Sequence, residues 1–249
     1  MTLNPLTQQF SSQNYFEQAC SRYQKQPFED DRAKANFPIL LENWSNSHSL
    51  ETRRQFYRVD TFLSEEQIAE APAVCTITAQ NGHSIHVYLF RDPINQYEVD
   101  AVINPANETL LGGGGADKEI HDGAGPNLVK ECAYLHGCEV GEAKITKGYD
   151  LPAKYVIHTV GPLLNENGSP NIEALETCYR SCFALCDKYH LKSIAAPCVA
   201  CGFYAFPVEV SAQIVRSVIQ EICGHTSVEK IVLSVPKDNE WQAYYKVFG

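Results

Sequence analysis

Short apolar runs alternate with longer amphipathic stretches over the last 177 or so residues of this 249-residue chain. The first two runs flank Asn81-Gly82, which predicts a β-hairpin. The alternation that follows predicts an α/β layer fold with a mostly parallel sheet. Ligands in such folds bind beyond the carboxyl ends of the strands. The expected strands are 74–79, 84–90, 100–104, 143–148, 154–160, 192–197 and 230–235, and the expected helices are 126–136, 171–189, 208–223 and 238–247.

The first part of the chain, residues 1–72, is polar and rich in Gln, Glu and Arg. Two stretches, 13–24 and 37–44, are expected to be helical, and residues 64–67 have the spacing of a capped short helix. The bulky apolar side chains of the second stretch need a surface to cover them. We therefore predict a docked helical extension, with a loose arm or an adaptor surface as alternatives. The other domain is expected to be 73–249.

Composition limits the classes of partner. The formal net charge of −10 repels a phosphate backbone, so nucleic acid is not an expected partner, whereas one small anion bound by local backbone groups is compatible with it. No apolar run of about 18 residues is present, so a membrane is not an expected partner. The N-terminus lacks the pattern of a secretory signal, which predicts a cytoplasmic protein, or a nuclear one in a eukaryote. The ten scattered cysteines are expected to be free, buried thiols.

Four consecutive glycines, Gly112–Gly115, follow a predicted buried strand and precede a predicted helix. Glycine lets the backbone approach a ligand closely, and the N–H groups at a helix N-terminus attract an anion. A flexible linker is the alternative when the run is taken in isolation. The run matches neither a Walker loop nor a dinucleotide fingerprint, because the required residues and spacing are missing.

A second loop, residues 197–207, also leads from a predicted strand to a predicted helix, with Pro207 at a position favoured for helix starts. Two neighbouring anion sites suit a pyrophosphate. The aromatic side chains of Phe203, Tyr204 and Phe206 offer faces for a sugar or a base.

The chain from about residue 74 onward resembles a macrodomain of the MacroD type. Asn104-Pro105-Ala106-Asn107 stands where this family has Asn-Ala-Ala-Asn, and residues 110–121, LLGGGGADKEIH, resemble its catalytic loop. Residues 141–162, GEAKITKGYDLPAKYVIHTVGP, are similar to another family motif. The resemblance implies a three-layer α/β/α sandwich that binds ADP-ribose in a cleft above the sheet.

The resemblance also implies roles for individual residues. Asn107 would contact the distal ribose with support from Asn104, Asp117 would lie beside the attacking water, and His121 would follow one helical turn later. The alternatives are a helix cap for Asp117 and plain packing for His121. The implied ligand-binding residues are Asp92 for adenine, Gly113, Gly114, Gly115 and Ala116 for one phosphate, and Ala200, Cys201, Gly202, Phe203 and Tyr204 around the other.

The sequence departs from the family pattern in three places. Residues 91–95 differ from the usual Gly-Asp-Ile-Thr around the adenine contact, and Ala205 replaces a glycine, which restricts the loop if that position needs a positive φ. The Cys-and-His insert of zinc-containing relatives is absent, so no metal or other cofactor is expected. Cys198-x-x-Cys201 alone is a weak indication of a redox or zinc pair.

The expected function is hydrolysis of the ester between ADP-ribose and an Asp or Glu side chain of a mono-ADP-ribosylated protein. O-acetyl-ADP-ribose is a second expected substrate, and a reader that binds ADP-ribose without cleavage is the alternative. Asp117 would either orient water while a ligand phosphate accepts the proton, or act as a general base with a pKa raised by burial.

Overall fold

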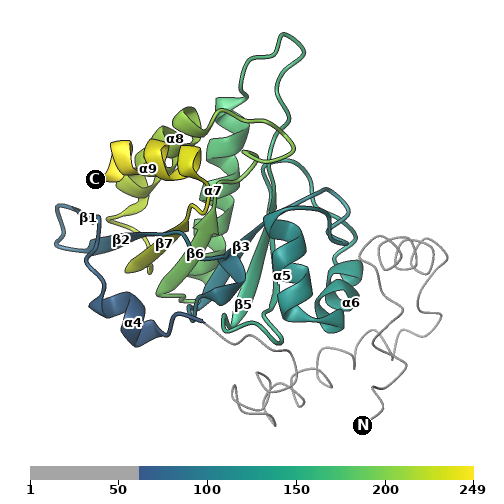
Figure 1. The fold of residues 1–249 in the computed structure, drawn as a ribbon, viewed down its shortest axis with the longest axis horizontal. Coiled ribbons are helices and arrows are strands. Elements are labelled where there is room, and N and C mark those ends of the chain that lie inside the picture. The colour runs from purple at the N-terminus through teal and green to yellow at the C-terminus, as the bar shows by residue number, and fades with distance from the viewer. Residues whose placement is uncertain (1–61) are drawn as a thin grey trace.

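A seven-stranded sheet forms the centre of the computed structural model, which describes residues 62–249 (Figure 1). The strand order is β1-β2-β7-β6-β3-β5-β4. The edge strands β1 and β4 pair antiparallel with their neighbours, and the inner strands pair parallel, which confirms the predicted mixed, mostly parallel sheet. The strands are β1 (Cys75–Thr78), β2 (Ser84–Phe90), β3 (Ala101–Ala106), β4 (Ala143–Lys147), β5 (Tyr155–Val160), β6 (Ser193–Pro197) and β7 (Lys230–Ser234).

Helices cover both faces of the sheet, so the predicted three-layer sandwich is confirmed (Figure 1). One face packs against α7 (Ile172–Lys188), α8 (Val208–Ile222) and α9 (Asp238–Phe248). The other packs against α4 (Glu65–Glu70), α5 (Ala116–Ala124) and α6 (Pro126–Tyr134). A short 3₁₀ helix, Ile94–Gln96, was not predicted.

The last residues of the expected extension pack on the domain. Ser64 and Gln67 form the predicted capping box at the start of α4. Ile68 is 2% exposed and belongs to the core on the α5 and α6 face, and Lys230 pairs with Glu65 at 3.2 Å. Helix α4 is therefore part of the same packed unit. The expected helices at 13–24 and 37–44 lie outside the described residues, and the boundary after residue 72 stays a prediction.

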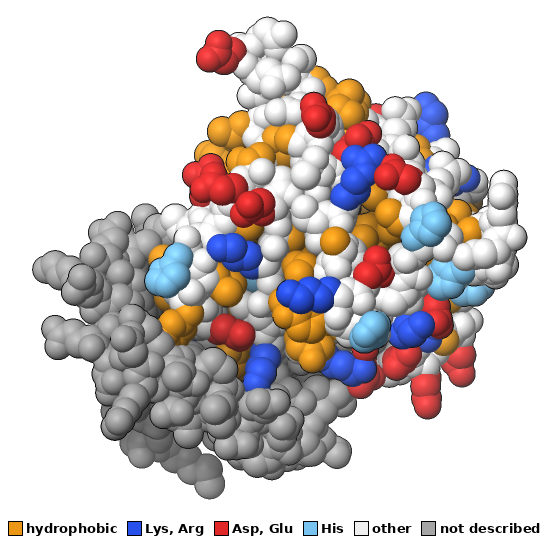
Figure 2. All heavy atoms as spheres, turned by 180° about the vertical axis from the view of Figure 1, so that it is seen from behind, with side chains coloured by type: hydrophobic (Ala, Val, Ile, Leu, Met, Phe, Trp, Pro, Cys, Tyr) orange, Lys and Arg blue, Asp and Glu red, His pale blue; other side chains and the backbone are white. Residues whose placement is uncertain are grey.

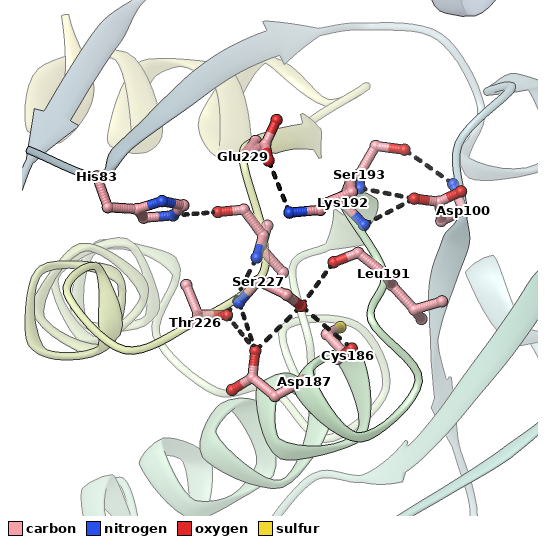
Figure 3. Close-up of polar contacts among 11 residues, drawn as sticks. His83, Asp100, Cys186, Asp187, Leu191, Lys192, Ser193, Thr226, Ser227 and Glu229 are labelled. Atoms are coloured by element: carbon pink, nitrogen blue, oxygen red, sulfur yellow. Dashed lines mark hydrogen bonds and ion pairs between the residues drawn. The ribbon is translucent and has the colours of Figure 1, made fainter.

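Two carboxylates fasten the loops at the amino ends of the strands (Figure 3). Asp100 accepts hydrogen bonds from the backbone N–H groups of Lys192 and Ser193, at 2.7 and 3.1 Å. Asp187 accepts from the hydroxyl of Thr226 and the N–H of Ser227, both at 2.7 Å. These bonds hold the loops at the amino ends of the strands in place, and the loops at the carboxyl ends remain available for ligand contacts.

Charges of both signs are mixed on one face of the domain (Figure 2), and six of the nine described cysteines are buried, whereas Cys75, Cys198 and Cys201 are partly exposed. On the face drawn in Figure 2, Lys and Arg side chains lie among Asp and Glu side chains rather than in a separate basic stripe. All nine cysteines of the described residues are free, and those on α7 are buried in its packed face, as predicted. Within residues 62–249, no helix combines the length and the apolar character needed to cross a bilayer.

Candidate functional site

A cavity of about 730 Å³ opens at the carboxyl ends of the parallel strands, where the α/β fold is expected to bind ligands. The loops after β3 and β6 and the segment before α9 form its walls. The predicted site residues that line it are Asn107, Gly113, Gly114, Gly115, Ala116, Asp117, Ala200, Gly202, Phe203 and Tyr204.

The loop after β3 is shaped by Asn107. Its side-chain Oδ1 accepts from the N–H and the hydroxyl of Thr109, and its Nδ2 donates to the carbonyl of Gly112 at 2.9 Å. Gly112 and Gly115 adopt φ values of 91° and 59°, which favour glycine. Among the described residues, the backbone N–H groups of 112–116 have no acceptor. They end at the N-terminus of α5 and can hold an anion.

The loop after β6 offers a second group of donors. The carbonyl of Ala200 accepts from the N–H of Phe206 at 3.1 Å, and Ala200 and Ala205 adopt φ values of 64° and 55°. No acceptor within residues 62–249 engages the N–H groups of 202–204. The N–H of Cys201 is already bonded to a carbonyl of its own loop, so the second cradle begins at Gly202. Phe203 is 98% exposed above it.

Asp117 lies on α5, one residue inside the helix, and is 3% exposed. Burial raises the pKa of this carboxyl to about 6, against the lowering effect of a hydrogen bond from Asn104 Nδ2 to Oδ1 at 2.7 Å. A Cβ added to Gly113 would lie 2.8 Å from Asp117 Oδ2. The second carboxylate oxygen therefore faces the glycine loop, and only glycine leaves room for it there.

Two neutral histidines lie behind Asp117. His121 Nε2 is 3.4 Å from Asp117 Oδ1, but burial lowers the His121 pKa to about 4, so this contact is not an ion pair at neutral pH. His158 is fully buried, and burial lowers its pKa to about 3. Its Nδ1 lies 3.0 Å from Asn104 Nδ2, which can only donate. The His158 proton is therefore on Nε2, which donates to Thr146 Oγ1 at 2.9 Å.

The ligand atoms of His121, Cys132 and His158 lie within 4.8 Å of one another, the arrangement among the described residues that comes nearest to a metal site. Burial holds the pKa of the Cys132 thiol well above its ordinary value, and a metal binds the thiolate. Both ring nitrogens of His158 already have partners. The geometry thus gives no reason to abandon the sequence-based expectation of no metal, which stays a prediction.

Other residues of the site had no signal in the sequence. Lys237 and Glu240 line the cavity from the last helix and the residue before it, and pair at 2.7 Å. Ile94 and Ser234 line it as well. Asp92 is not among the lining residues; its backbone carbonyl accepts from Tyr97 and Ser234, and its role as adenine contact stays a prediction. The predicted residues Asn104, His121 and Cys201 are not among the lining residues, and Asn104 and His121 lie next to Asp117 instead.

Known proteins resemble this chain over the same region. Residues 103–215 match the family model described as Macro domain. The mouse protein named ADP-ribose glycohydrolase MACROD2 is 46% identical over 186 residues, which cover 73% of this chain but only 38% of the mouse protein. A Macro domain-containing protein of Chlorobaculum tepidum is 40% identical over 167 residues, 67% of this chain and 97% of that protein.

A solved structure, the Trypanosoma brucei macrodomain in complex with ADP-ribose, shares 31% identity and aligns with a TM-score of 0.72 over 92% of this chain and 94% of that one. The similarity extends over nearly the whole length of two of these relatives, in sequence for the first and in fold for the second. The chain belongs to the macro domain family.

Proposed function

We propose that this chain binds ADP-ribose in the cavity and hydrolyses the ester that joins ADP-ribose to an Asp or Glu side chain of a mono-ADP-ribosylated protein. Two relatives support the proposal, one named as an ADP-ribose glycohydrolase and one crystallised with ADP-ribose. The observation that carries it is the buried Asp117 carboxylate, with one oxygen bonded to Asn104 and the other facing the glycine loop.

Two groups of backbone donors suit the two phosphates of the ligand. The N–H groups of 112–116 and of 202–204 point from separate loops that line one cavity, and neither group depends on a charged side chain. Backbone donors can hold a pyrophosphate in a chain of formal net charge −10. We expect micromolar affinity for ADP-ribose, a binding free energy of about −8 kcal/mol.

Asp117 acts as the general base. A base is most effective when its pKa lies near the working pH, and a pKa of about 6 leaves this carboxylate mostly ionised at neutral pH. Water attacks the ester carbonyl carbon while Asp117 Oδ2 accepts its proton. The acyl–oxygen bond then breaks, the ribose oxygen takes up a proton, and a carboxylate and ADP-ribose result. Asn104 holds Oδ1, so the free oxygen keeps its direction toward the water.

O-acetyl-ADP-ribose is a second substrate of the same site. Its acyl group is attached to the same sugar through an ester bond, so the carboxylate and the two cradles serve it without change. The neutral state of His121 excludes a charged imidazole near the developing negative charge.

The test is incubation of the full chain with a protein that carries ADP-ribose on Glu side chains. We expect release of free ADP-ribose, detected by mass spectrometry, and an unmodified Glu left behind. Asp117→Asn should bind ADP-ribose but release it at least about 10²-fold more slowly, and Asp122→Asn on the exposed side of the same helix should behave as the wild type. Binding without release by the wild type would identify a reader instead of an enzyme.

A further inference from the structure

The loop after β6 brings two cysteines together at the wall of the cavity. Cys198 follows β6 directly and lines the cavity, and the N–H of Cys201 donates to its carbonyl at 3.2 Å. With Ala200 at φ 64°, this bond closes a four-residue turn. Such a turn holds its first and last Cα atoms within about 7 Å, and a disulfide needs about 4.4–6.8 Å. Each thiol also shifts the pKa of the other, and the Cys201 thiol donates to the carbonyl of Val199 inside the same turn at 3.4 Å.

Accessibility distinguishes these thiols from most of the others. Of the nine described cysteines, six are buried, and Cys75, Cys198 and Cys201 are partly exposed. Cys75 lies on the edge strand β1, which β2 and β7 separate from β6 and its loop. The pair in the loop is thus both within reach of a small reagent and held together by one tight turn.

The surroundings of Cys201 favour its thiolate. The hydrogen bond from the Cys198 thiol, a hydrogen bond from Ser211 and the Lys237 ammonium lower its pKa, against opposing effects of burial and Glu240. The pKa of Cys198 is raised well above its ordinary value, first because its proton is held in the bond to Cys201 and second because of burial. One thiol is suited to attack and its neighbour to resolve.

We propose that Cys198 and Cys201 are a redox-active dithiol, which hydrogen peroxide oxidises to a disulfide that lowers the affinity of the cavity for its ligand. The Cys201 thiolate attacks one oxygen of the peroxide and the O–O bond breaks, which gives a sulfenic acid and hydroxide. The hydroxide takes up a proton to form water. The Cys198 sulfur then displaces the hydroxyl from Cys201 as a second water. Two thiols are oxidised, one peroxide is reduced, and a dithiol reagent reverses the change.

The effect on binding follows from the position of the turn. Ala200 and Gly202 line the cavity on either side of Cys201, so a covalent bond that tightens the turn moves the donors of the second cradle. This half of the proposal rests on the proposed function, since the affected ligand is ADP-ribose. By reciprocity, bound ADP-ribose should shift the equilibrium toward the dithiol, because each state disfavours the other.

The experiment follows one peptide. Trypsin cleaves after Lys192 and Arg216, and residues 193–216 contain these two cysteines and no other. One sample of the full chain is treated with hydrogen peroxide, alkylated and digested, and the mass of this peptide is measured by mass spectrometry. In other samples, the affinity for ADP-ribose is measured by calorimetry before and after peroxide treatment. We expect loss of two hydrogens from the peptide, an affinity at least about tenfold weaker, and recovery with dithiothreitol. In a dithiothreitol redox buffer, excess ADP-ribose should lower the fraction of the peptide that carries the disulfide at equilibrium.

Matched variants separate the causes. Cys75→Ser should respond as the wild type does, and the double variant Cys198→Ser/Cys201→Ser should show the same affinity before and after peroxide. A peptide that is still alkylated at both cysteines after peroxide treatment contradicts the proposal. A disulfide that leaves the affinity unchanged contradicts it as well. If the reduced protein does not bind ADP-ribose, the proposed function fails, and the peptide mass still decides whether the dithiol is redox-active.

Discussion

The side-chain amide of Asn104 donates to Asp117 Oδ1 at 2.7 Å, although Asn104 lies in the buried strand β3 and Asp117 lies in the first turn of α5, thirteen residues later. The same amide nitrogen also lies 3.0 Å from His158 Nδ1. Asn104 thereby joins the carboxylate of the site to a fully buried imidazole.

Asn104→Ala should leave two buried acceptors, Asp117 Oδ1 and His158 Nδ1, without their donor. We expect the free energy of unfolding to fall by about 1–3 kcal/mol, measured by urea denaturation. Asn127→Ala is the matched control, because the Asn127 side chain contacts only the exposed Lys130 among the described residues; it should change stability by less than about 0.5 kcal/mol. Equal losses in both variants would contradict the structural role of Asn104.

The rate of ester hydrolysis should depend on the protonation of Asp117. Its pKa of about 6 predicts a kcat that is half-maximal near pH 6, rises to a plateau above pH 7 and falls below pH 5. His121, with a pKa of about 4, should add no step between pH 6 and 8. A pH series of initial rates at saturating substrate tests this. A profile that is flat from pH 5 to 8 would exclude Asp117 as the titrating base.

Asp117→Asn should make the protein more stable at neutral pH while abolishing most turnover. The carboxyl pKa is raised from 3.8 to about 6 on folding, so the folded state binds more protons than the unfolded state between these values. Stability therefore decreases as pH rises from about 4 to 6, and the full cost, on the order of 3 kcal/mol, is present above pH 6. Asparagine carries no charge and removes this cost.

Thermal denaturation of the two proteins checks the sign. The Asp117→Asn protein should melt at a higher temperature than the wild type at pH 7.5, and the difference should shrink at pH 4, where the wild-type carboxyl is protonated. In the same preparations kcat should fall by about 10²-fold or more. A variant that is less stable than the wild type at pH 7.5 would show that burial of the ionised carboxylate does not destabilise the folded protein.

Gly113→Ala and Gly114→Ala form a matched pair in the glycine loop. An added Cβ at residue 113 would lie 2.8 Å from Asp117 Oδ2, whereas at residue 114 it would meet nothing within 4 Å. Both variants keep the backbone N–H. Gly113→Ala should therefore displace the carboxylate and lower kcat by about tenfold or more, while Gly114→Ala should leave the melting temperature unchanged. Calorimetry with ADP-ribose separates a clash with the ligand from displacement of Asp117.

Local patterns predicted most of the fold. The hairpin around Asn81-Gly82, the capping box at Ser64 and the alternating strands and helices all follow from short stretches of sequence, and each is confirmed. The sequence also indicated that Ala205 would be restricted if its position needed a positive φ, and it adopts φ 55°. These features depend on neighbours in the chain, so one sequence is enough to detect them.

Parts of the site depend on contacts between distant residues. Lys237 and Glu240 reach the cavity only because α9 packs beside the parallel strands, and nothing near residue 240 indicates the glycine loop more than 120 residues earlier. The pKa of Asp117 is likewise a property of its burial in the folded chain and not of its sequence neighbours. The Cys198–Cys201 spacing was visible in the sequence, but the tight turn that holds the two residues together was not.

The carboxylates of Asp100 and Asp187 have a consequence for deuterium exchange. They accept hydrogen bonds from the amides of Lys192, Ser193 and Ser227 at the amino ends of the strands. At the carboxyl ends, the amides of 112–116 and 202–204 have no acceptor among the described residues. Exchange of a bonded amide requires its hydrogen bond to open. Amides at the amino ends of the strands should therefore exchange slowly, and amides of the loops at the carboxyl ends should exchange fast. An anion that binds both loops would slow the exchange of these loop amides. The amides held by Asp100 and Asp187 would exchange at an unchanged rate and serve as an internal reference.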